Sequence, residues 1–509
     1  MKQSEALEIM LAGASAFLTG APGAGKTYVL NRFVQAKREQ GSTVAVTATT
    51  GIAATHVDGQ TIHAWSGIGV ADSLTDSLIK TIRTRRRKQI KSTDVLVIDE
   101  ISMMHAWLFD MVDEVCRIIR KDSRPFGGLQ VVLSGDFFQL PPVGASRRNT
   151  AMTPTPEYVS MRERYAQAGK NPEGFVTESF AWDALDPVIC YLDEQHRQDD
   201  GQLLRVLTDI RGDMVSQIDK DILITRYQVP LEEGKQAVSL FPQNRQADLV
   251  NERQLAQIDG DEHEFFAEAR GQANLIERLK RNMLAPEHLV LKKNAVVMAV
   301  RNDAEGRYVN GSLGMVIGFL KDARGGWPIV EFENGNVVTM KRADWEMMDG
   351  DDVLASVSQV PLRCAWAITI HKSQGMTLDS AIMDLSRTFA PGMGYVALSR
   401  VEKLDGLYLN GVHNRMFNVS ADAVLLDDAL RAGSARAAAQ LAEQGADSFS
   451  HRSPATMPYS ARRVNPAQRN PRRPCSTRST NSVARANRRS ELLHRYRRLA
   501  FVTPDEPHD

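Results

Sequence analysis

The nine residues TGAPGAGKT, at 19–27, constrain this 509-residue chain more than any other stretch. An apolar run at 14–18 leads into the glycine-rich turn, and a segment that favours a helix follows from Lys26 to Lys37. Closely spaced glycines allow successive N–H groups to converge on a phosphate, and the start of the helix adds its positive end. The complete GxxxxGK[ST] pattern between a strand and a helix therefore predicts a nucleoside-triphosphate site and makes a chance glycine turn a weak alternative.

Each residue type in this loop has a chemical task. Lys26 would reach the β- and γ-phosphates, and the Thr27 hydroxyl would ligate Mg²⁺. The candidate nucleotide contacts are Gly20, Gly23, Ala24, Gly25, Lys26, Thr27 and Tyr28.

Two later segments supply polar groups at the ends of apolar strands. Asp99 and Glu100 follow VLVI, so we expect Asp99 to hold the metal ion and Glu100 to act as the general base. Gln139 lies in SGDFFQLPPV, on a loop that we expect to face the γ-phosphate. The alternative for Gln139 is a surface loop stiffened by Pro141 and Pro142.

The spacing of apolar segments predicts an α/β fold. β-Branched runs near 14–19, 43–48, 95–98 and 131–134 each precede a polar turn, as in a doubly wound parallel sheet. A second α/β unit is predicted from Val188. Further boundaries also follow from changes of pattern: a long mobile loop at 144–178, a small antiparallel barrel inserted at 286–350, a helix at 420–445 and a disordered tail at 446–509.

Composition sets limits on partners and location. No apolar run reaches the roughly 18 residues of a membrane helix, and MKQSEALEIM lacks a signal-peptide pattern, so we expect a protein that stays where it is made, without a membrane partner. Four scattered cysteines (Cys116, Cys190, Cys364 and Cys475) predict free thiols. The net charge is zero, but from residue 451 onward thirteen arginines and four acids give +9. Such a tail either tethers nucleic acid or is a solvated extension.

Two arginines beyond the first unit, Arg197 in EQHRQDD and Arg400 in YVALSR, are candidate arginine fingers. If the second unit folds against the first, both guanidiniums would reach the γ-phosphate and neutralise developing charge. A surface ion pair is the commoner fate of an arginine, and spacing alone does not decide between these roles.

Taken in order, several segments resemble the motifs of the Pif1 helicases, in the RecD-like branch of superfamily 1. These segments are TGAPGAGKT, TATTGIAATHVDGQTIHAWSGIG (47–69), VIDEISMM (97–104), PFGGLQVVLSGDFFQLPPV (125–143), EQHRQ (194–198), LKKNAVVMAVRN…YVNGSLGMVIGF (291–319), PLRCAWAITIHKSQGMTLD (361–379) and YVALSR (395–400). The stretch LFDMVDEVCRIIRKDSRPFGG (108–128) is similar to the segment that marks Pif1 proteins. The likeness extends over roughly residues 1–412.

The resemblance implies an ATP- and Mg²⁺-dependent helicase that moves 5′→3′ on single-stranded DNA and opens forks in replication, repair, recombination or telomere maintenance. It also suggests G-quadruplexes and RNA–DNA hybrids as substrates, a monomer when free of DNA, and a cytoplasmic (nucleoid) location in a prokaryote. The implied architecture is two RecA-like domains, 1A (1–187) and 2A (188–285 and 351–445), with a 1B wedge near 70–92 and an SH3-like 2B domain at 286–350.

The same resemblance assigns further residues. Gln3 stands where the family reads adenine, Arg197 matches motif IV, Arg400 matches motif VI, and Gly375 joins the nucleotide contacts. The expected DNA contacts are Thr47, Thr50, His63, Trp65, His371, Lys372, Ser373 and Gln374. The first four supply hydrogen-bonding groups for phosphates and, in Trp65, a stacking face, although each residue type also serves as core or loop filler.

Some features depart from the family pattern or leave alternatives open. GMG at 392–394 stands where many relatives have Gly-Gln, and the arginine-rich tail has no counterpart in the helicase core. A RecD- or TraA-type helicase shares the sheet and the motifs. A nucleic-acid-binding scaffold with a regulatory nucleotide site is the alternative from outside the enzymes. Glu100, Gln139, Arg197 and Arg400 disfavour it, because a pure switch does not need them.

Overall fold

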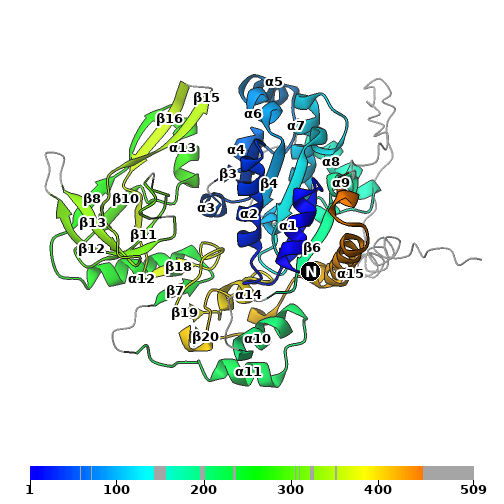
Figure 1. The fold of residues 1–509 in the computed structure, drawn as a ribbon. Helices are drawn as coiled ribbons and strands as arrows, with labels where there is room; N and C mark the ends of the chain where they lie inside the picture. Colours follow the sequence, from blue (N-terminus) through cyan, green and yellow to red (C-terminus); the bar gives the residue numbers. More distant parts are fainter. Residues whose placement is uncertain are drawn as a thin grey trace, which may run out of the picture.

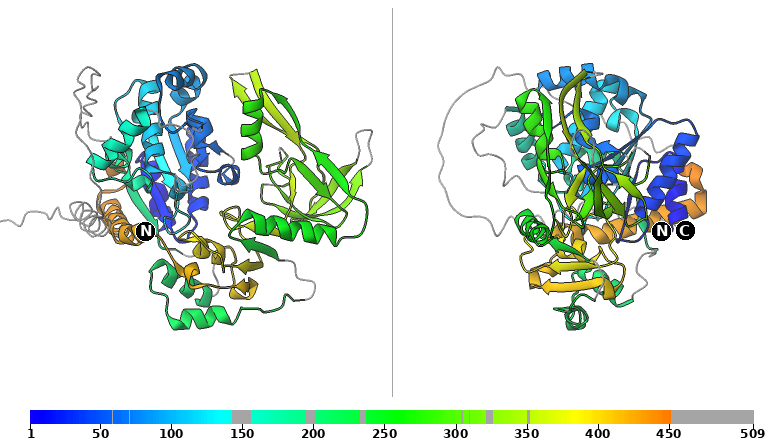
Figure 2. Two further views of the ribbon diagram at one scale, coloured as in Figure 1. Left: turned by 180° about the vertical axis from the view of Figure 1, so that it is seen from behind. Right: turned by 90° about the vertical axis from the view of Figure 1, so that its left-hand side faces the viewer.

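The computed structural model describes residues 1–450, apart from 58, 70, 143–155, 195–200, 233–236, 304, 309, 321–325 and 350–351. It contains a first α/β domain, a smaller second α/β domain, and an antiparallel β insertion that projects from the second (Figures 1 and 2). The predicted mixed α/β fold class, with parallel sheets and an antiparallel insertion, is therefore confirmed. Within the described residues, no helix has both the length and the apolar character to cross a membrane.

A six-stranded parallel sheet forms the centre of the first domain, in the order β3-β2-β4-β5-β1-β6. Its strands are β1 (Ala16–Gly20), β2 (Val44–Ala48), β3 (Gln60–Thr61), β4 (Val95–Asp99), β5 (Gln130–Ser134) and β6 (Val188–Leu192). β1 is buried along its whole length, and its three successive apolar residues, Ala16 to Leu18, fit a sheet covered by helices on both faces. Phe17 points into the core on one face, and Leu18 points into the core on the other.

Nine helices of the described chain accompany this sheet. They are α1 (Gln3–Leu11), α2 (Lys26–Glu39), α3 (Gly51–His56), α4 (Ile62–Ser66), α5 (Asp76–Arg85), α6 (Arg87–Ser92), α7 (Ala106–Arg120), α8 (Pro156–Gln167) and α9 (Phe180–Leu185). α5 and α6 occupy the region in which a wedge is expected, at one end of the domain (Figure 1). Arg120 of α7 holds the end of α6, because its guanidinium donates to the carbonyl oxygens of Ile90 and Thr93, and it also donates to that of Gly127.

Two sequence-based boundaries in this domain are wrong. β6 does not begin the second unit, because it pairs in parallel with β1 and completes the first sheet. Its apolar pattern predicts a buried strand but carries no information on which sheet it joins. The loop predicted over 144–178 contains α8, which packs through the buried Tyr165, whose hydroxyl donates to Asp110 at 2.7 Å. The part of that loop at 143–155 lies outside the described residues.

The second domain has a four-stranded parallel sheet in the order β18-β7-β19-β20. Its strands are β7 (Val238–Phe241), β18 (Ala367–Thr369), β19 (Ala381–Asp384) and β20 (Leu407–Gly411). Its helices are α10 (Gly201–Arg211), α11 (Gln217–Ile224), α12 (Asn244–Ala256) and α14 (Met393–Leu398). α14 lies between this sheet and the first domain, and α10 packs against α14 (Figure 1).

The insertion is longer than its predicted range of 286–350. It consists of β8 (His263–Phe266), β9 (Glu268–Gly271), α13 (Ala273–Asn282), β10 (His288–Leu291), β11 (Val296–Ala299), β12 (Leu313–Leu320), β13 (Trp327–Phe332), β14 (Val337–Thr339), β15 (Ala343–Asp349), β16 (Asp352–Gln359) and β17 (Leu362–Cys364). The early strands join it by long-range antiparallel pairing, β8 with β10 and β9 with β16. β17 pairs with β11 in the same way. Asn-Gly turn signals mark only local hairpins, so they do not reveal these pairings.

The predicted C-terminal helix is present as α15 (Ala421–Gln444), but it was expected to belong to the second domain. Instead it runs back along the first domain and packs against α1 and β6 (Figure 1). Residues 446–449, placed in the predicted tail, form a 3₁₀ turn because Phe449 is buried in the core beside α1 and α2. The arginine-rich residues 451–509 lie outside the described residues.

Candidate active site

The glycine-rich loop joins β1 to α2, as predicted, and its glycines have left-handed backbones. Gly20, Gly23 and Gly25 have φ angles of 149°, 84° and 84°. A Cβ atom on Gly25 would also displace the side-chain amide of Gln3 from its present position. Gln3 Nε2 donates to the carbonyl oxygen of Ala24 at 3.0 Å. The residue expected to read adenine therefore already lies against the loop.

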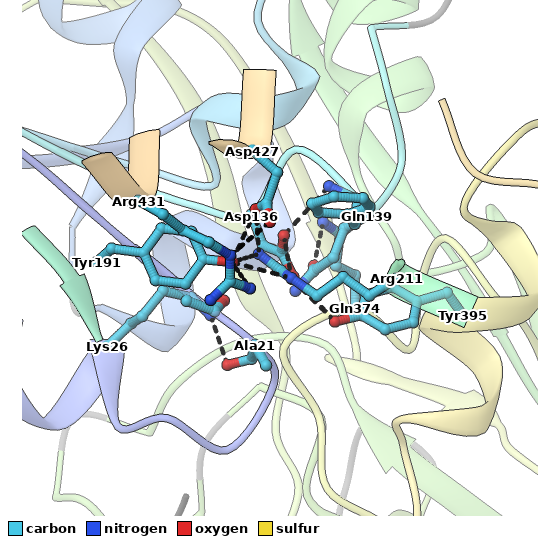
Figure 3. Close-up of polar contacts among 12 residues, drawn as sticks. Ala21, Lys26, Asp136, Gln139, Tyr191, Arg211, Gln374, Tyr395, Asp427 and Arg431 are labelled. Atoms are coloured by element: carbon cyan, nitrogen blue, oxygen red, sulfur yellow. Dashed lines mark hydrogen bonds and ion pairs between the residues drawn. The ribbon is translucent and has the colours of Figure 1, made fainter. Parts of the chain in front are cut away.

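Lys26 lies at the first position of α2, and its side chain curls back over the loop (Figure 3). Its ammonium group donates to the carbonyl oxygens of Gly20 at 2.8 Å and Ala21 at 3.2 Å. Burial lowers the pKa of Lys26, and the nearby carboxylates of Asp136 and Glu100 act in the opposite direction. Thr27 is exposed beside it. The loop thus presents an ammonium and a hydroxyl group where phosphate oxygens would bind.

The acidic pair lies at the end of β4, and Glu100 has an unusual backbone. Its φ and ψ angles are 51° and 43°, a left-handed conformation that costs a residue with a side chain roughly 1–2 kcal/mol. Its carbonyl oxygen accepts a hydrogen bond from Thr49 Oγ1 at 2.9 Å. Strain of this kind persists only where the surroundings impose it, and it is common at functional sites.

Both carboxyl groups of the pair have raised pKa values. Burial raises the pKa of Glu100 to about 7, and the charge of neighbouring Asp99 adds to the effect. Burial also raises the pKa of Asp99, against hydrogen bonds from Ser134 and from the Glu100 N–H. A carboxylate with a pKa near neutrality is suited to accept a proton from water.

Gln374 of the second domain completes this group of side chains (Figure 3). Its Nε2 donates to Glu100 Oε2 at 2.9 Å and to Gln139 Oε1 at 3.1 Å. Gln139 is 6% exposed, so the alternative of a surface loop does not apply. We expected Gln374 to contact DNA, and the structure places it beside the candidate base instead. Its position follows from packing between the two domains, which motif spacing does not specify.

Of the two candidate arginine fingers, the structure describes Arg400 only. Arg400 is 2% exposed and lies close enough to Glu100 to favour its ionised form. Its guanidinium donates to the carbonyl oxygens of Ser373 at 3.2 Å and Met376 at 3.0 Å. Arg197 lies outside the described residues. Two further expected nucleotide contacts are exposed. They are Gly375, which follows Gln374 and has a φ of 82°, and Tyr28 on α2.

Besides Gln374, three of the expected DNA contacts are buried. Trp65 is 0% exposed in the hydrophobic core, so it offers no stacking face. Thr47 is also 0% exposed, and its hydroxyl donates to the Val97 carbonyl oxygen at 2.6 Å. Ser373 is 0% exposed and donates to the Ile370 carbonyl oxygen at 2.9 Å. These side chains pack in the core or donate hydrogen bonds to backbone carbonyl oxygens. The predictions that they contact DNA are therefore not supported.

The other four expected DNA contacts remain partly accessible. Thr50 accepts a hydrogen bond from the Ala53 N–H at the start of α3, and His63 lies on α4. The His371 ring lies 6.1 Å from that of Phe389. Burial lowers the pKa of Lys372 to about 8, with Arg363 contributing. A phosphate beside Lys372 would compensate this loss of solvation.

The two glycines of GMG (392–394) lie against neighbouring backbone. Gly392, with a φ of 77°, begins α14, and a Cβ atom there would collide with the carbonyl oxygens of Phe138 and Gln139. A Cβ atom on Gly394 would collide with the Met416 carbonyl oxygen. The glycines therefore allow α14 to lie directly against the loop of Gln139. Sequence reasoning missed this contact, and it missed the buried pair of Asp136 and Arg211 that lies beside it.

Comparisons with known proteins agree with this arrangement. Residues 4–156 match the family model of PIF1-like helicase. ATP-dependent DNA helicase Pif1 of Psychrobacter sp. (strain PRwf-1) is 37% identical over 472 aligned residues, a match that covers 81% of this chain and 68% of that protein. The vertebrate relatives are longer, and the matched region spans about 60% of their length.

Solved structures show the same likeness. The crystal structure of Pif1 helicase from Candida albicans has a TM-score of 0.73 at 31% identity, and the match covers 84% of this chain and 98% of that one. Pif1 helicase from Bacteroides in complex with ADP-AlF3 and ssDNA has a TM-score of 0.62 at 27% identity, covering 85% and 95%. The extent and identity of these matches show that the chain belongs to the Pif1 helicase family.

Proposed function

We propose that this protein is an ATP-dependent DNA helicase of Pif1 type, which hydrolyses ATP to move 5′→3′ along single-stranded DNA. One observation supports this most strongly. The second-domain amide of Gln374 is hydrogen bonded to both Glu100 and Gln139 of the first domain. A hydrolysis site completed by side chains from two domains makes turnover depend on how those domains meet. This dependence is what a motor requires.

The residues of the loop suit a nucleoside triphosphate with Mg²⁺. Lys26 would exchange its two carbonyl acceptors for phosphate oxygens, and Gln3 is placed beside the loop for the base. Thr27 and Asp99 would offer two oxygen ligands, and the charge of Asp99 acts on Lys26, the residue before Thr27. This suits Mg²⁺, which commonly takes one or two protein oxygens and completes its shell with phosphate and water. The bound ion would neutralise charge that develops on the phosphates.

Glu100 is our candidate for the general base. Its raised pKa allows it to accept the proton of the attacking water near neutral pH. Gln374 donates to one carboxylate oxygen of Glu100 and to the Gln139 side chain, which supports a role in orienting the base. We propose that Gln139 responds when the γ-phosphate leaves. We assign Arg400, and Arg197 by family resemblance, to the charge that develops on that phosphate.

DNA binding is proposed for a surface formed by Thr50, His63, His371 and Lys372. A second, strongly basic surface lies on α5 and α6, the proposed wedge. Its exposed cations are Lys80, Arg83, Arg85, Arg87, Lys88 and Lys91. Residues 77–93 contain no acid. Because the first 450 residues carry a net charge of −9, this is a local concentration of positive charge suited to phosphates.

The finer assignments also remain part of the proposal. Forked DNA is the expected substrate, with G-quadruplexes and RNA–DNA hybrids as further candidates, and the protein is expected to be monomeric when free of DNA. Its place of action would be the compartment that holds the DNA, the nucleoid in a prokaryote. Roles in replication, repair, recombination or telomere maintenance follow from the same activity.

Two measurements on the wild-type protein test the function. ATPase activity should rise strongly when single-stranded DNA is added, and strand displacement should require a 5′-tailed rather than a 3′-tailed duplex. Glu100→Gln is the matched control, because it should bind nucleotide and DNA without turnover. An ATPase rate that DNA leaves unchanged would favour a scaffold with a regulatory nucleotide site. Displacement from the 3′-tailed duplex alone would refute the proposed direction.

A further inference from the structure

A polar cluster with a buried centre lies beside the nucleotide loop and joins parts of the chain that are distant in sequence (Figure 3). We call it the Arg211 cluster, and it consists of Asp136, Tyr191, Arg211, Tyr395, Asp427 and Arg431. These residues come from the loop after β5, from β6, from α10, from α14 and from α15. The first two elements belong to the first domain, and α10 and α14 belong to the second.

Arg211 is the centre of the cluster, because its guanidinium contacts all of these elements. Its NH1 group donates to Asp136 Oδ1 at 2.7 Å, to Asp136 Oδ2 at 2.8 Å and to Tyr395 OH at 3.1 Å. Its NH2 and Nε groups donate to Tyr191 OH at 2.9 and 3.2 Å. The guanidinium also lies 4.2 Å from the ring centre of Phe138. A planar fork with fixed donors is suited to such a junction, and an ammonium group is not.

Asp136 connects Arg211 to the turn after β5 that carries Gln139. Its Oδ1 accepts a hydrogen bond from the Phe138 N–H at 3.1 Å, and its carbonyl oxygen accepts one from the Gln139 N–H at 3.0 Å. The same carboxylate therefore binds Arg211 and closes the turn that presents Gln139. On its other side this turn packs against the start of α14 at Gly392, and α14 leads to Arg400.

The charges of Asp136 and Arg211 also affect the electrostatic potential at the nucleotide loop. Asp136 is 0% exposed, and Arg211 is the cation bound to it. Burial lowers the pKa of Lys26, and Asp136 is the largest of the charges that oppose this effect, so its carboxylate lies within reach of the loop. Without Arg211, an uncompensated negative charge would face the position of the phosphates.

We propose that Arg211 is a positioning residue for hydrolysis: it holds the turn of Gln139 against α14, so that Gln139, Gln374 and Arg400 keep their relative placement when the domains move. The inference rests on the proposed function. Arg211 donates hydrogen bonds to Asp136 and Tyr395, and we infer that it acts through these two residues. Its second effect is to neutralise Asp136.

Four variants of the full chain separate the two effects. Arg211→Met removes both, and we expect the DNA-stimulated kcat to fall by about 10-fold or more together with a weaker affinity for a fluorescent ADP analogue. Arg211→Lys keeps the positive charge but loses the planar guanidinium group. It should lower kcat by about 5-fold while the affinity for the ADP analogue stays near normal. In Asp136→Asn combined with Arg211→Met, affinity should recover while kcat stays low. Arg431→Met is the control, because Arg431 contacts Tyr191 and Asp427 but not the loop.

The outcomes are decisive in either direction. Wild-type kcat in Arg211→Lys, or a double variant that regains kcat with its affinity, would overturn the positioning role. If Arg211→Met does not fold, as thermal unfolding would reveal, Arg211→Lys and Tyr395→Phe decide the question, and wild-type kcat in both refutes it. Failure of the proposed function would look different, since the wild type itself would then lack DNA-stimulated ATPase. In that case basal ATPase and analogue affinity test the same prediction.

Discussion

Replacement of Glu100 by Gln should make this protein more stable while it abolishes turnover. The pKa of Glu100 rises from its ordinary 4.5 to about 7, first through burial and then through the charge of Asp99. Between these two values the native state binds more protons than the unfolded state, so stability falls as pH increases through this window. The rise corresponds to about 3 kcal/mol of lost stability once Glu100 is ionised. Gln carries no charge and avoids this loss.

The expected effect is measurable as a shift in the thermal midpoint. For a domain of this size, about 3 kcal/mol corresponds to roughly 6–12 °C, and we expect a gain of about 5 °C because the partner charge on Asp99 remains. The gain should be present at about pH 8 and nearly absent at about pH 5, where Glu100 is protonated in the wild type. Thermal unfolding without nucleotide or Mg²⁺ gives both values. Glu157→Gln, at an exposed position on α8, is the matched control and should change neither midpoint.

The same pKa predicts the pH dependence of the wild-type enzyme. Because the base must be ionised, kcat/KM for ATP should rise with pH through an acid limb near pH 7. An acid limb below about pH 5.5, or a Glu100→Gln midpoint that is unchanged at about pH 8, would refute the reasoning, because either result would mean that the carboxyl group is well solvated.

Three further predictions concern the surfaces around the site. Arg120→Ala should lower the thermal midpoint by several °C, since charged hydrogen bonds contribute about 1.5–3 kcal/mol. Because Arg120 anchors α6, the variant should lose more strand-displacement activity than ATPase activity. Equal losses of the two activities would contradict a wedge role for α5 and α6. Replacing Arg83, Arg87 and Lys88 together by Gln should lower the slope of log affinity against log salt for forked DNA by about 2–3, and an unchanged slope would show that this surface does not bind DNA. Deletion of 451–509 should weaken DNA binding and flatten its salt dependence without loss of ATPase, whereas equal loss of both would assign the tail to the core.

Positions set by local sequence agree with the structure. The glycine-rich loop, the acidic pair after β4 and the strand-ending segment of Gln139 all have the predicted surroundings. In each case a few consecutive residues determine the backbone: glycines allow left-handed turns, and an apolar run ends where the sheet ends. The position of each polar group along its own strand therefore follows from the sequence.

Residue type did not distinguish a DNA contact from a core residue. Trp65 and Thr47 stand in a segment rich in hydrogen-bonding groups, yet the sheet and its helices bury both. A Trp or Thr side chain suits either environment, and the choice depends on which neighbours cover it. The same reason explains the boundary at β6, because an apolar strand joins whichever sheet edge the chain can reach.

The sequence by itself determined that two parallel sheets and a phosphate-binding loop would form, because periodicity and glycine spacing act over a few residues. Only the tertiary structure decided that Gln374 would meet Glu100, which is 274 positions away, and that Arg211 would join Asp136 to Tyr395. Such contacts depend on how the domains pack. Packing is a property of whole surfaces, and no local pattern in the chain encodes it.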